Sequence, residues 1–428
     1  MKFVEVERRD MEPAATEEPA VSSVQFDDFE ELFDEESTTD EEPPAVPSPR
    51  SLASRAEAFF APRSRSPSPA RLPDVSDDAP RAELAAISVE HEAGRPEVSD
   101  ADFERLGVLG LGSFGKVVLA RHKTTRALYA LKLVSLARLV DQKQVERMLE
   151  EKRVLEGLEH PCVVRLHFAF RTPGHACLGF EYCAGGELFH HLCRRRRLEP
   201  DAVAFYGAEI ALALQCAHEH GVVYRDVKPE NCFLDAAGHL KLGDFGLAKG
   251  GVRDPFRGAF SVCGTPEYMA PDVLAQHPAG YGTAVDFWGM GVCLYELLTG
   301  MPPWYTTERK KLFERIVKAP LRIPPDVPVD AGVAISRLLR RHPRQRLCAV
   351  GGADALRTEP FFASVDFDAL VLGAVRPPIR PCRDLRRPAH RVNFDYKFTK
   401  LSVATPVEGP LPDFVESELE ETTWGFVR

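Results

Sequence analysis

The chain has 428 residues, of which 44% are apolar and 28% charged, so it has a globular composition that suits one large domain with tails or two to three domains. Its net charge of -10 is uneven, because residues 1–100 hold 25 acidic and 10 basic side chains; without a broad basic field we expect no nucleic-acid partner. No apolar run approaches the ~18 residues of a membrane span, and the start lacks the apolar core of a signal peptide. The ten cysteines form no C-x-x-C pair. Together these features favour a cytoplasmic protein with reduced thiols.

Residues 1–100 are predicted to be a disordered region, acidic and then rich in Pro, Ser and Arg. They carry 12 prolines and the acidic stretch "FDDFEELFDEESTTDEE" (26–42). Ordering a residue costs about 1–2 kcal/mol, and these segments offer too few apolar groups to offset that cost. A solubilising tail is one interpretation. Because residues 26–33 place apolar side chains at helical spacing, a short helix that binds a groove on a partner is the other.

Regular periodicity begins near residue 102. Residues 117–134, "VVLARHKTTRALYALKLV", predict two strands around a turn, and residues 141–158 predict a charged helix with one apolar side. Residues 199–221 predict a further helix, closed by Gly221. The resulting expectation is an α+β fold, with a small sheet-based lobe over about 103–180 and a larger helical lobe over about 185–362. An irregular, proline-rich tail is expected over 363–428.

The glycine run "GVLGLGSFGKVVLA" (107–120) can fold over phosphates in three known ways. A dinucleotide fold needs an acidic residue about 20 positions beyond the run, but the residue there is Ser135, so this pattern does not fit. A P-loop needs Ser or Thr after Lys116, but the residue there is Val117, so this pattern does not fit either. The third pattern, G-x-G-x-x-G-x-V, is the flap of a protein kinase, which requires a lysine on the next strand. Lys132 in "YALKLV" is that lysine.

Three further motifs follow in order: "VVYRDVKPENCFL" (222–234), "LKLGDFGLAK" (240–249) and "SVCGTPEYMAPDVL" (261–274). They resemble the catalytic loop, the metal-binding loop and the end of the activation segment of protein kinases. Over roughly 103–428 the chain resembles the AGC group of serine/threonine kinases, nearest the protein kinase B, serum/glucocorticoid-regulated and ribosomal-protein kinase branch. Tyr224 in place of the usual histidine is part of this likeness. The resemblance implies a bilobal kinase fold, ATP and Mg²⁺.

Site residues follow from the resemblance. It assigns the nucleotide to Gly110, Leu111, Gly112, Ser113, Phe114, Gly115, Lys116 and Val117 of the flap, to Lys132 anchored by Glu151, and to the hinge backbone at Glu181 and Cys183, behind the gatekeeper Phe180. It assigns Mg²⁺ to Asp244 and Asn231, the acceptance of the substrate proton to Asp226, and the γ-phosphate to Lys228. Each of these residues, taken alone, could equally be an ordinary surface charge or a turn-forming residue. Only their occurrence together, in this order, indicates catalysis. A kinase-fold scaffold that acts by binding partners is the alternative function.

The resemblance also implies regulation and substrate choice. Ser261 matches the activation-loop phosphosite that an upstream kinase would modify, and Arg225, Lys249 and Arg147 are the cations expected to hold its phosphate. Glu187, Glu230 and Glu296 match an acidic subsite for substrates with basic residues, chiefly arginine, ahead of the acceptor. The arginine run 194–197 is interpreted as a solvated face, with a nuclear-import signal as the alternative.

The tail extends the likeness and departs from it. "NFDYKFT" (393–399) resembles a segment that crosses the nucleotide site, and Thr405 resembles a turn-motif phosphosite. "ETTWGFVR" (421–428) resembles a hydrophobic motif that docks on the small lobe, but Gly425 stands at the usual phosphoacceptor. Asp272 replaces a glutamate that normally pairs with an arginine, here Arg346, and its shorter side chain is expected to loosen that pair.

Overall fold

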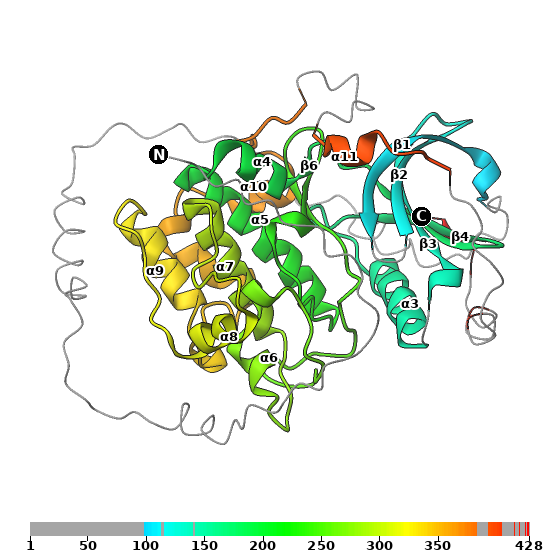
Figure 1. Ribbon diagram of the computed structural model, residues 1–428. Coiled ribbons are helices and arrows are strands. Elements are labelled where there is room, and N and C mark those ends of the chain that lie inside the picture. The colour runs from blue at the N-terminus through cyan, green and yellow to red at the C-terminus, as the bar shows by residue number, and fades with distance from the viewer. Residues whose placement is uncertain are drawn as a thin grey trace, which may run out of the picture. The chain divides into compact units, whose positions relative to one another are not determined.

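The computed structural model describes residues 98–112, 115–139, 142–382 and 393–404, together with Val415, Leu419, Trp424, Phe426 and Val427. The expected disorder of the N-terminal region, its partner-binding helix, and the sites at Ser113, Phe114 and Thr405 fall outside the described residues. The described part forms two lobes, a sheet with one long helix and a larger helical lobe, which confirms the expected bilobal α+β fold (Figure 1).

The small lobe is built on an antiparallel six-stranded sheet in the order β1-β2-β3-β5-β4-β9. Its strands are β1 (Phe103–Gly112), β2 (Gly115–His122), β3 (Leu128–Ser135), β4 (Leu166–Thr172), β5 (His175–Glu181) and β9 (Phe426–Val427). Alternating residues such as Val118, Leu131 and Leu133 point to one face and bury there against Phe168 and Phe103. The two strands predicted over 117–134 are therefore confirmed as β2 and β3.

Helix α3 (Gln142–Gly157) packs beside the sheet (Figure 1). Its apolar positions Val145 and Met148, one turn apart, bury against Val134 of β3 and Ala176 of β5. The remaining positions are largely charged. The charged helix predicted over 141–158 is confirmed, and its apolar side fixes which of its acidic residues face the interior.

The large lobe surrounds helices α5 and α7, whose residues are buried on nearly all sides. Its helices are α4 (Leu188–Arg195), α5 (Pro200–Glu219), α6 (Pro271–Ala275), α7 (Ala284–Thr299), α8 (Arg309–Lys318), α9 (Val329–Leu338) and α10 (Phe367–Val371). A three-stranded sheet in the order β6-β7-β8 comprises β6 (Gly186–Glu187), β7 (Cys232–Leu234) and β8 (Leu240–Leu242). Helix α5 begins at Pro200, where proline's missing N–H costs nothing, and the chain leaves it through Gly221 at φ +71°.

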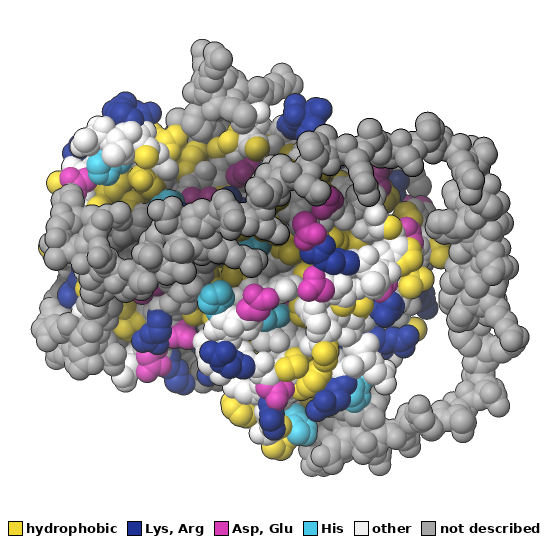
Figure 2. Space-filling model, turned by 180° about the vertical axis from the view of Figure 1, so that it is seen from behind, with side chains coloured by type: hydrophobic (Ala, Val, Ile, Leu, Met, Phe, Trp, Pro, Cys, Tyr) yellow, Lys and Arg dark blue, Asp and Glu magenta, His cyan; other side chains and the backbone are white. Residues whose placement is uncertain are grey.

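Short 3-10 helices connect these elements: η1 (Asp100–Asp102), η2 (Leu136–Arg138), η3 (Pro229–Asn231), η4 (Pro266–Tyr268), η5 (Pro343–Gln345), η6 (Gly352–Thr358) and η7 (Pro360–Phe362). All ten cysteines lie in the described part of the chain and are free thiols. None of the described helices combines the length and apolarity needed to cross a membrane. On the face in Figure 2, basic and acidic side chains are both scattered over the described surface.

The prediction of an irregular tail is wrong at two places, where short helices form within it. In α10, Phe367 and Leu370 are buried and the Asp366 side chain accepts a hydrogen bond from the Ala369 N–H at 2.9 Å. In α11 (Tyr396–Thr399), Asp395 accepts from the Lys397 N–H at 2.8 Å. Each helix therefore has an N-cap carboxylate that satisfies a backbone N–H donor and stabilises the helix locally. The prolines around these segments led to the prediction of irregular structure.

The expected loosening of the Asp272–Arg346 pair is also wrong. Two guanidinium nitrogens of Arg346 lie 2.6 and 3.1 Å from the two Asp272 oxygens, and the Arg346 side chain is fully buried. The guanidinium also donates to the Ala284 carbonyl at 2.8 Å and lies over the Trp288 ring. Because these neighbours hold the guanidinium in place, the shorter carboxylate still forms a two-pronged contact.

Candidate active site

The first component of the site is an ion pair between the sheet and α3. Lys132 is on β3, and its Nζ lies 2.7 and 2.8 Å from the two carboxylate oxygens of Glu151 on α3. Glu151 is buried, and the apolar side of α3 directs it toward the strand. Burial opposes the charge of Lys132, but the carboxylates of Glu151 and Asp244 outweigh it, so the pKa of Lys132 is raised above its usual value.

Asp244 is the second component. Its Oδ1 lies 3.3 Å from Lys132 Nζ, and its side chain is about half exposed. Lys132 is the main reason that the pKa of the Asp244 carboxyl lies below its usual value. The backbone of Asp244 is left-handed, at φ +49°. An ionised carboxylate is thus presented beside a cation, in a conformation that non-glycine residues seldom adopt.

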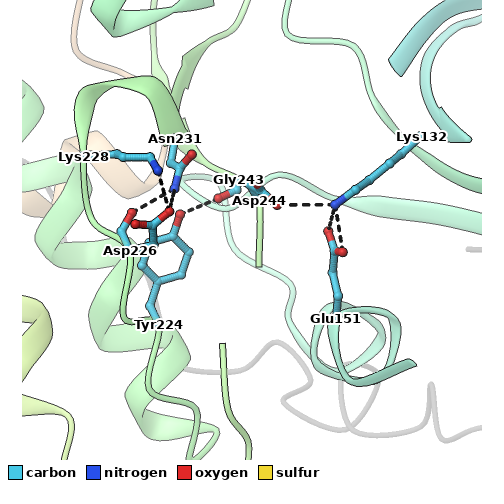
Figure 3. Close-up of polar contacts among 8 residues, drawn as sticks. All are labelled: Lys132, Glu151, Tyr224, Asp226, Lys228, Asn231, Gly243 and Asp244. Atoms are coloured by element: carbon cyan, nitrogen blue, oxygen red, sulfur yellow. Dashed lines mark hydrogen bonds and ion pairs between the residues drawn. The ribbon is translucent and has the colours of Figure 1, made fainter. Parts of the chain in front are cut away.

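Two buried aromatic rings in edge-to-face contact support the loop that carries Asp244. The Tyr224 hydroxyl donates to the Gly243 carbonyl at 2.5 Å, and the Tyr224 and Phe245 rings meet edge to face with centroids 4.9 Å apart. Both rings are fully buried. Asp244 is therefore flanked by two residues that the large lobe holds in place, as Figure 3 shows for Tyr224 and Gly243.

Asp226 lies at the centre of a second polar network (Figure 3). Lys228 Nζ lies 2.7 Å from its Oδ2, and Asn231 Nδ2 donates to the same oxygen at 2.8 Å. Thr265 donates to Oδ1 through its N–H at 3.0 Å and its hydroxyl at 2.7 Å, and Lys228 donates to the Thr265 hydroxyl oxygen at 2.7 Å. The catalytic-loop residues and the activation segment are thus joined around one carboxylate.

Sequence reasoning missed Asp286, which holds this loop. Its oxygens accept hydrogen bonds from the N–H groups of Tyr224 at 2.9 Å and Arg225 at 2.7 Å, and His218 lies 2.7 Å from the same carboxylate. Asp286 is buried in the first turn of α7. A signal was available, because it is the one charge within the otherwise apolar start "AVDFWGMGVCL", and a buried carboxylate needs partners.

The residues assigned to a metal ion fit one. Asn231 uses its amide nitrogen for Asp226, so its amide oxygen is the atom that can ligate a cation. Asp244 supplies an ionised carboxylate. Mg²⁺ in phosphate-transfer sites takes one or two carboxylate or amide ligands from the protein and completes its shell with phosphates and water, which is the oxygen set present here.

The glycine run is partly explained by packing. A Cβ on Gly115 would lie 1.7 Å from the Leu133 carbonyl oxygen on β3, so this position requires glycine whether or not a nucleotide binds. A Cβ on Gly110 would meet nothing within 4 Å. Lys116 was expected to contact the nucleotide, but its Nζ donates to the tail carbonyls of Ser402 and Ala404 at 3.3 and 2.8 Å. These two carbonyls are the partners of its side chain in the structure, and its contact with the nucleotide stays a prediction.

Flap and hinge frame the same region. Gly112 and Gly115 face each other at the tip where β1 and β2 meet, Leu111 is exposed, and Val117 is half-buried. The Glu181 side chain accepts from the Arg165 N–H at 2.7 Å and pairs with Lys241 at 3.0 Å, so its backbone is the part that can face an adenine. Burial raises the pKa of the Cys183 thiol well above its usual value.

The protein kinase domain family matches residues 103–362. The chain belongs to the protein kinase family. It is 40% identical over 332 residues to the serine/threonine-protein kinase gad8 of Schizosaccharomyces pombe, covering 76% of this chain and 56% of that protein. It is 39% identical over 355 residues to the RAC-beta serine/threonine-protein kinase of Mus musculus, covering 81% and 71%. It is 39% identical over 327 residues to the serine/threonine-protein kinase Sgk2 of Homo sapiens, covering 76% and 87%.

These relatives place the chain in the AGC group, in the branch of protein kinase B and the serum/glucocorticoid-regulated kinases, as the motifs suggested. The family implies ATP and a divalent metal ion. The chain spans 56% of gad8 and 64% of a RAC-beta kinase of Xenopus laevis, so these relatives are longer proteins.

The cations predicted to surround Ser261 lie together. Arg147, Arg225 and Lys249 line a pocket of about 510 Å³ together with Ser261, which is exposed. Arg225 Nε also donates to the Leu247 carbonyl at 2.7 Å, and the Tyr281 hydroxyl donates to the Ser261 carbonyl at 2.6 Å. The sequence thus identified residues that the fold brings to one pocket.

The three acidic residues predicted for the substrate subsite differ in their surroundings. Burial, and then the negative charge of the neighbouring Glu230, raise the pKa of Glu187 to about 7. Glu296 is buried on α7 and accepts a hydrogen bond from the Tyr268 hydroxyl. Glu187 and Glu230 are therefore the more accessible pair, and Glu296 also has a structural role.

The tail of the kinase contacts both the hinge and the small lobe. Phe394 stacks on Tyr182 of the hinge with centroids 5.9 Å apart, and Asn393 Nδ2 donates to the Ala184 carbonyl at 3.0 Å. Farther on, strand β9 pairs antiparallel with β4, with Phe426 opposite Ala169. The expected docking at this end is present.

Sequence reasoning missed two residues of this docking segment. Val415 and Leu419 are completely buried in the cluster formed by α3, β3 and β5, with Trp424 partly buried beside them. The Trp424 indole N–H donates to the Leu419 carbonyl at 3.3 Å. Their spacing of four residues was the available signal, since it places two side chains on one helical face.

Proposed function

We propose that this chain is an active serine/threonine protein kinase, which transfers the γ-phosphate of Mg-ATP to a hydroxyl of a protein substrate. The observation that carries the proposal is that the predicted charged residues form a set of two groups, each held by direct contacts. Glu151, Lys132 and Asp244 form one group, and Asp226 and Lys228 form the other (Figure 3). Phosphoryl transfer through a loose transition state depends on positioning and on neutralising charge, and this set supplies both.

Asp226 is the proposed acceptor of the substrate proton. Asn231 and Thr265 hold its two oxygens from different sides, so its carboxylate has one fixed orientation. Lys228 lies 2.7 Å from that carboxylate and would bring an ammonium group to the phosphoryl oxygens as charge develops there. The proton passes from the substrate hydroxyl to Asp226 while the bond from the hydroxyl oxygen to the γ-phosphorus forms and the bond from that phosphorus to the β-phosphate oxygen breaks, with ADP as the leaving group.

Lys132 is proposed to bind the α- and β-phosphates, with Glu151 fixing its direction. Bound with the nucleotide, Mg²⁺ supplies positive charge that offsets the negative charge of the β- and γ-phosphates. Asp244 and the amide oxygen of Asn231 are its proposed ligands. The backbone of Glu181 and Cys183 would pair with adenine, and Phe394 beside Tyr182 would close that side of the nucleotide.

Substrates are proposed to carry arginine ahead of the acceptor. Two neighbouring carboxyl groups, Glu187 and Glu230, supply a site for a guanidinium, which binds carboxylates through paired charge-assisted hydrogen bonds. The raised pKa of Glu187 favours this choice, because a bound cation relieves the repulsion between the two acids.

Activation is proposed to occur through phosphorylation of Ser261 by an upstream kinase. The pocket that Ser261 lines offers Arg147, Arg225 and Lys249, which suits a dianionic phosphate. Arg225 adjoins Asp226 in the sequence and Arg147 lies one turn before Glu151, so a phosphate held by both would join the catalytic loop to α3. The cytoplasmic location, and a partner for the acidic N-terminal region, are further proposals that rest on composition alone.

The test is transfer of labelled phosphate from Mg-ATP to serine peptides by the full-length chain after activation. We expect transfer to a peptide with arginine before the serine, and little transfer to a matched peptide with glutamate in those positions. A scaffold would bind nucleotide or partners and transfer no label. Absence of transfer by the activated protein would therefore overturn the proposed function.

A further inference from the structure

Helix α3 carries two adjacent glutamates that face different elements. Glu151 faces Lys132 on β3, whereas Glu150 faces the activation segment. One oxygen of Glu150 accepts a hydrogen bond from the backbone N–H of Gly250 at 2.9 Å, and its other oxygen lies 2.7 Å from Arg153 of the same helix. Glu150 therefore joins α3 to a segment that lies 100 residues farther along the chain.

The backbone at Gly250 is itself fixed to the catalytic loop. Its neighbour Lys249 exchanges two backbone hydrogen bonds with Val223, at 2.9 and 3.0 Å, three residues before Asp226. A Cβ on Gly250 would lie 2.9 Å from the Glu150 oxygen, so the absence of a side chain lets the carboxylate reach the amide. Through these two contacts, the position of α3 is tied to the position of the catalytic loop.

Glu150 also lines the pocket that contains Ser261. The cations of this pocket are Lys143, Arg147, Arg153, Arg225 and Lys249, and its acidic residues are Glu146 and Glu150. Thus the chain supplies a carboxylate of its own within the pocket that we assign to the Ser261 phosphate. Unlike that phosphate, the carboxylate is always present, and its partner is a backbone amide rather than a cation of the activation segment.

We infer that Glu150 is a positioning residue that holds α3, and with it the Lys132–Glu151 pair, against the activation segment while Ser261 is unphosphorylated. This inference rests on the proposed function. When Ser261 carries a phosphate, Arg147, Arg225 and Lys249 supply a second connection between the same elements, and the contribution of Glu150 becomes small. The kinase therefore has a basal activity that depends on Glu150 and an activated state that does not.

The experiment compares full-length chains with Glu150→Ala in two backgrounds: Ser261→Ala, and Ser261 fully phosphorylated. In the Ser261→Ala background we expect kcat to fall about tenfold, the size of losing one hydrogen bond to a charged group, with the KM for peptide little changed. In the phosphorylated background we expect a loss below about twofold, because the cations then hold the segment. Glu150→Gln retains an acceptor oxygen and should recover most of the basal rate.

Hydrogen exchange at the Gly250 amide is the second measurement, and it does not require catalysis. Exchange of this amide should become faster in Glu150→Ala than in the matched control Glu156→Ala, which removes a glutamate of the same helix that pairs with Lys152 at 2.6 Å.

Unchanged exchange at Gly250, or equal loss of kcat in both backgrounds, would overturn the inference. Failure of the proposed function would look different, since then no form would transfer phosphate, whereas the exchange result would still decide whether Glu150 holds the segment. Should Glu150→Ala fail to fold, Glu150→Leu, which also lacks an acceptor but keeps the bulk of the side chain, takes its place in the same exchange measurement.

Discussion

Lys132 Nζ lies 2.7 Å from Glu151 and 3.3 Å from Asp244, so one ammonium group contacts both a helix of the small lobe and the metal-binding loop. Glu151 is buried, while Asp244 is about half exposed. The cation is thus anchored on its buried side and available on its open side.

Replacing Lys132 with methionine should therefore affect both stability and catalysis. Glu151 would keep its burial and lose its counter-ion, which costs about 3–5 kcal/mol for a buried pair unless the carboxyl takes up a proton. Denaturant unfolding of the variant measures this cost. The double variant with Glu151→Gln should recover much of the stability and none of the activity. Recovery of activity in the double variant would contradict the role proposed for Lys132.

Leu419 is expected to stabilise the small lobe although it lies far along the tail. It is completely buried beside Val145 and Met148 of α3. Leu419→Ala should lower the free energy of unfolding by about 2 kcal/mol, as for other buried leucines at the lower end of the range. Leu372→Ala, at a leucine that is 80% exposed, is the control and should change it by less than about 0.5 kcal/mol. Equal effects of the two substitutions would show that the docking segment does not pack as described.

The parts of the site carried by short motifs could be predicted from the sequence. Lys132, Asp226 and Asp244 stand in motifs whose order and spacing predict their roles together, so their proximity follows from the fold that the motifs identify. The contact of Glu150 could not be predicted, because its partner is the backbone N–H of Gly250, and nearly every residue type carries such a group. The only sequence signal was the glycine itself.

Tertiary neighbours also explain the expectation that was wrong at Asp272. The shorter side chain of Asp272 was expected to weaken its pair, but Ala284 and Trp288 hold the Arg346 guanidinium within reach. A tertiary contact that the motif did not predict also forms at Lys116, whose Nζ donates to the tail carbonyl of Ala404, 288 residues away. In both cases, the contacting group comes from a distant part of the chain.

Binding of arginine peptides should depend on pH around neutrality. The pKa of Glu187 is raised to about 7 by burial and by Glu230, so its carboxyl is mostly protonated at pH 6 and mostly charged at pH 8. The KM for an arginine-containing peptide should therefore fall as the pH rises across this range. Glu187→Gln should raise the KM and remove that dependence. A wild-type KM that stays constant from pH 6 to 8 would contradict the assignment of Glu187 to the subsite.

The pair between Asp272 and Arg346 should contribute strongly to stability. Because the guanidinium is fully buried, Asp272→Asn leaves it without a counter-ion and should cost about 3–5 kcal/mol in denaturant unfolding. The comparison is Lys311→Ala, which removes an exposed pair with Glu308 at 4.0 Å and should cost less than about 1 kcal/mol. Similar small losses for both variants would indicate that Arg346 finds other partners.

Phosphate transfer by Asp226→Asn, measured beside wild type with nucleotide affinity determined for both, tests the central claim most directly. The substitution keeps the shape of the side chain and removes the proton acceptor, so kcat should fall by about 10²–10⁴ while ATP binding changes little. If Asp226→Asn transferred phosphate at the wild-type rate, the carboxylate at the centre of the network would take no part in the chemistry, and the proposed mechanism would be wrong.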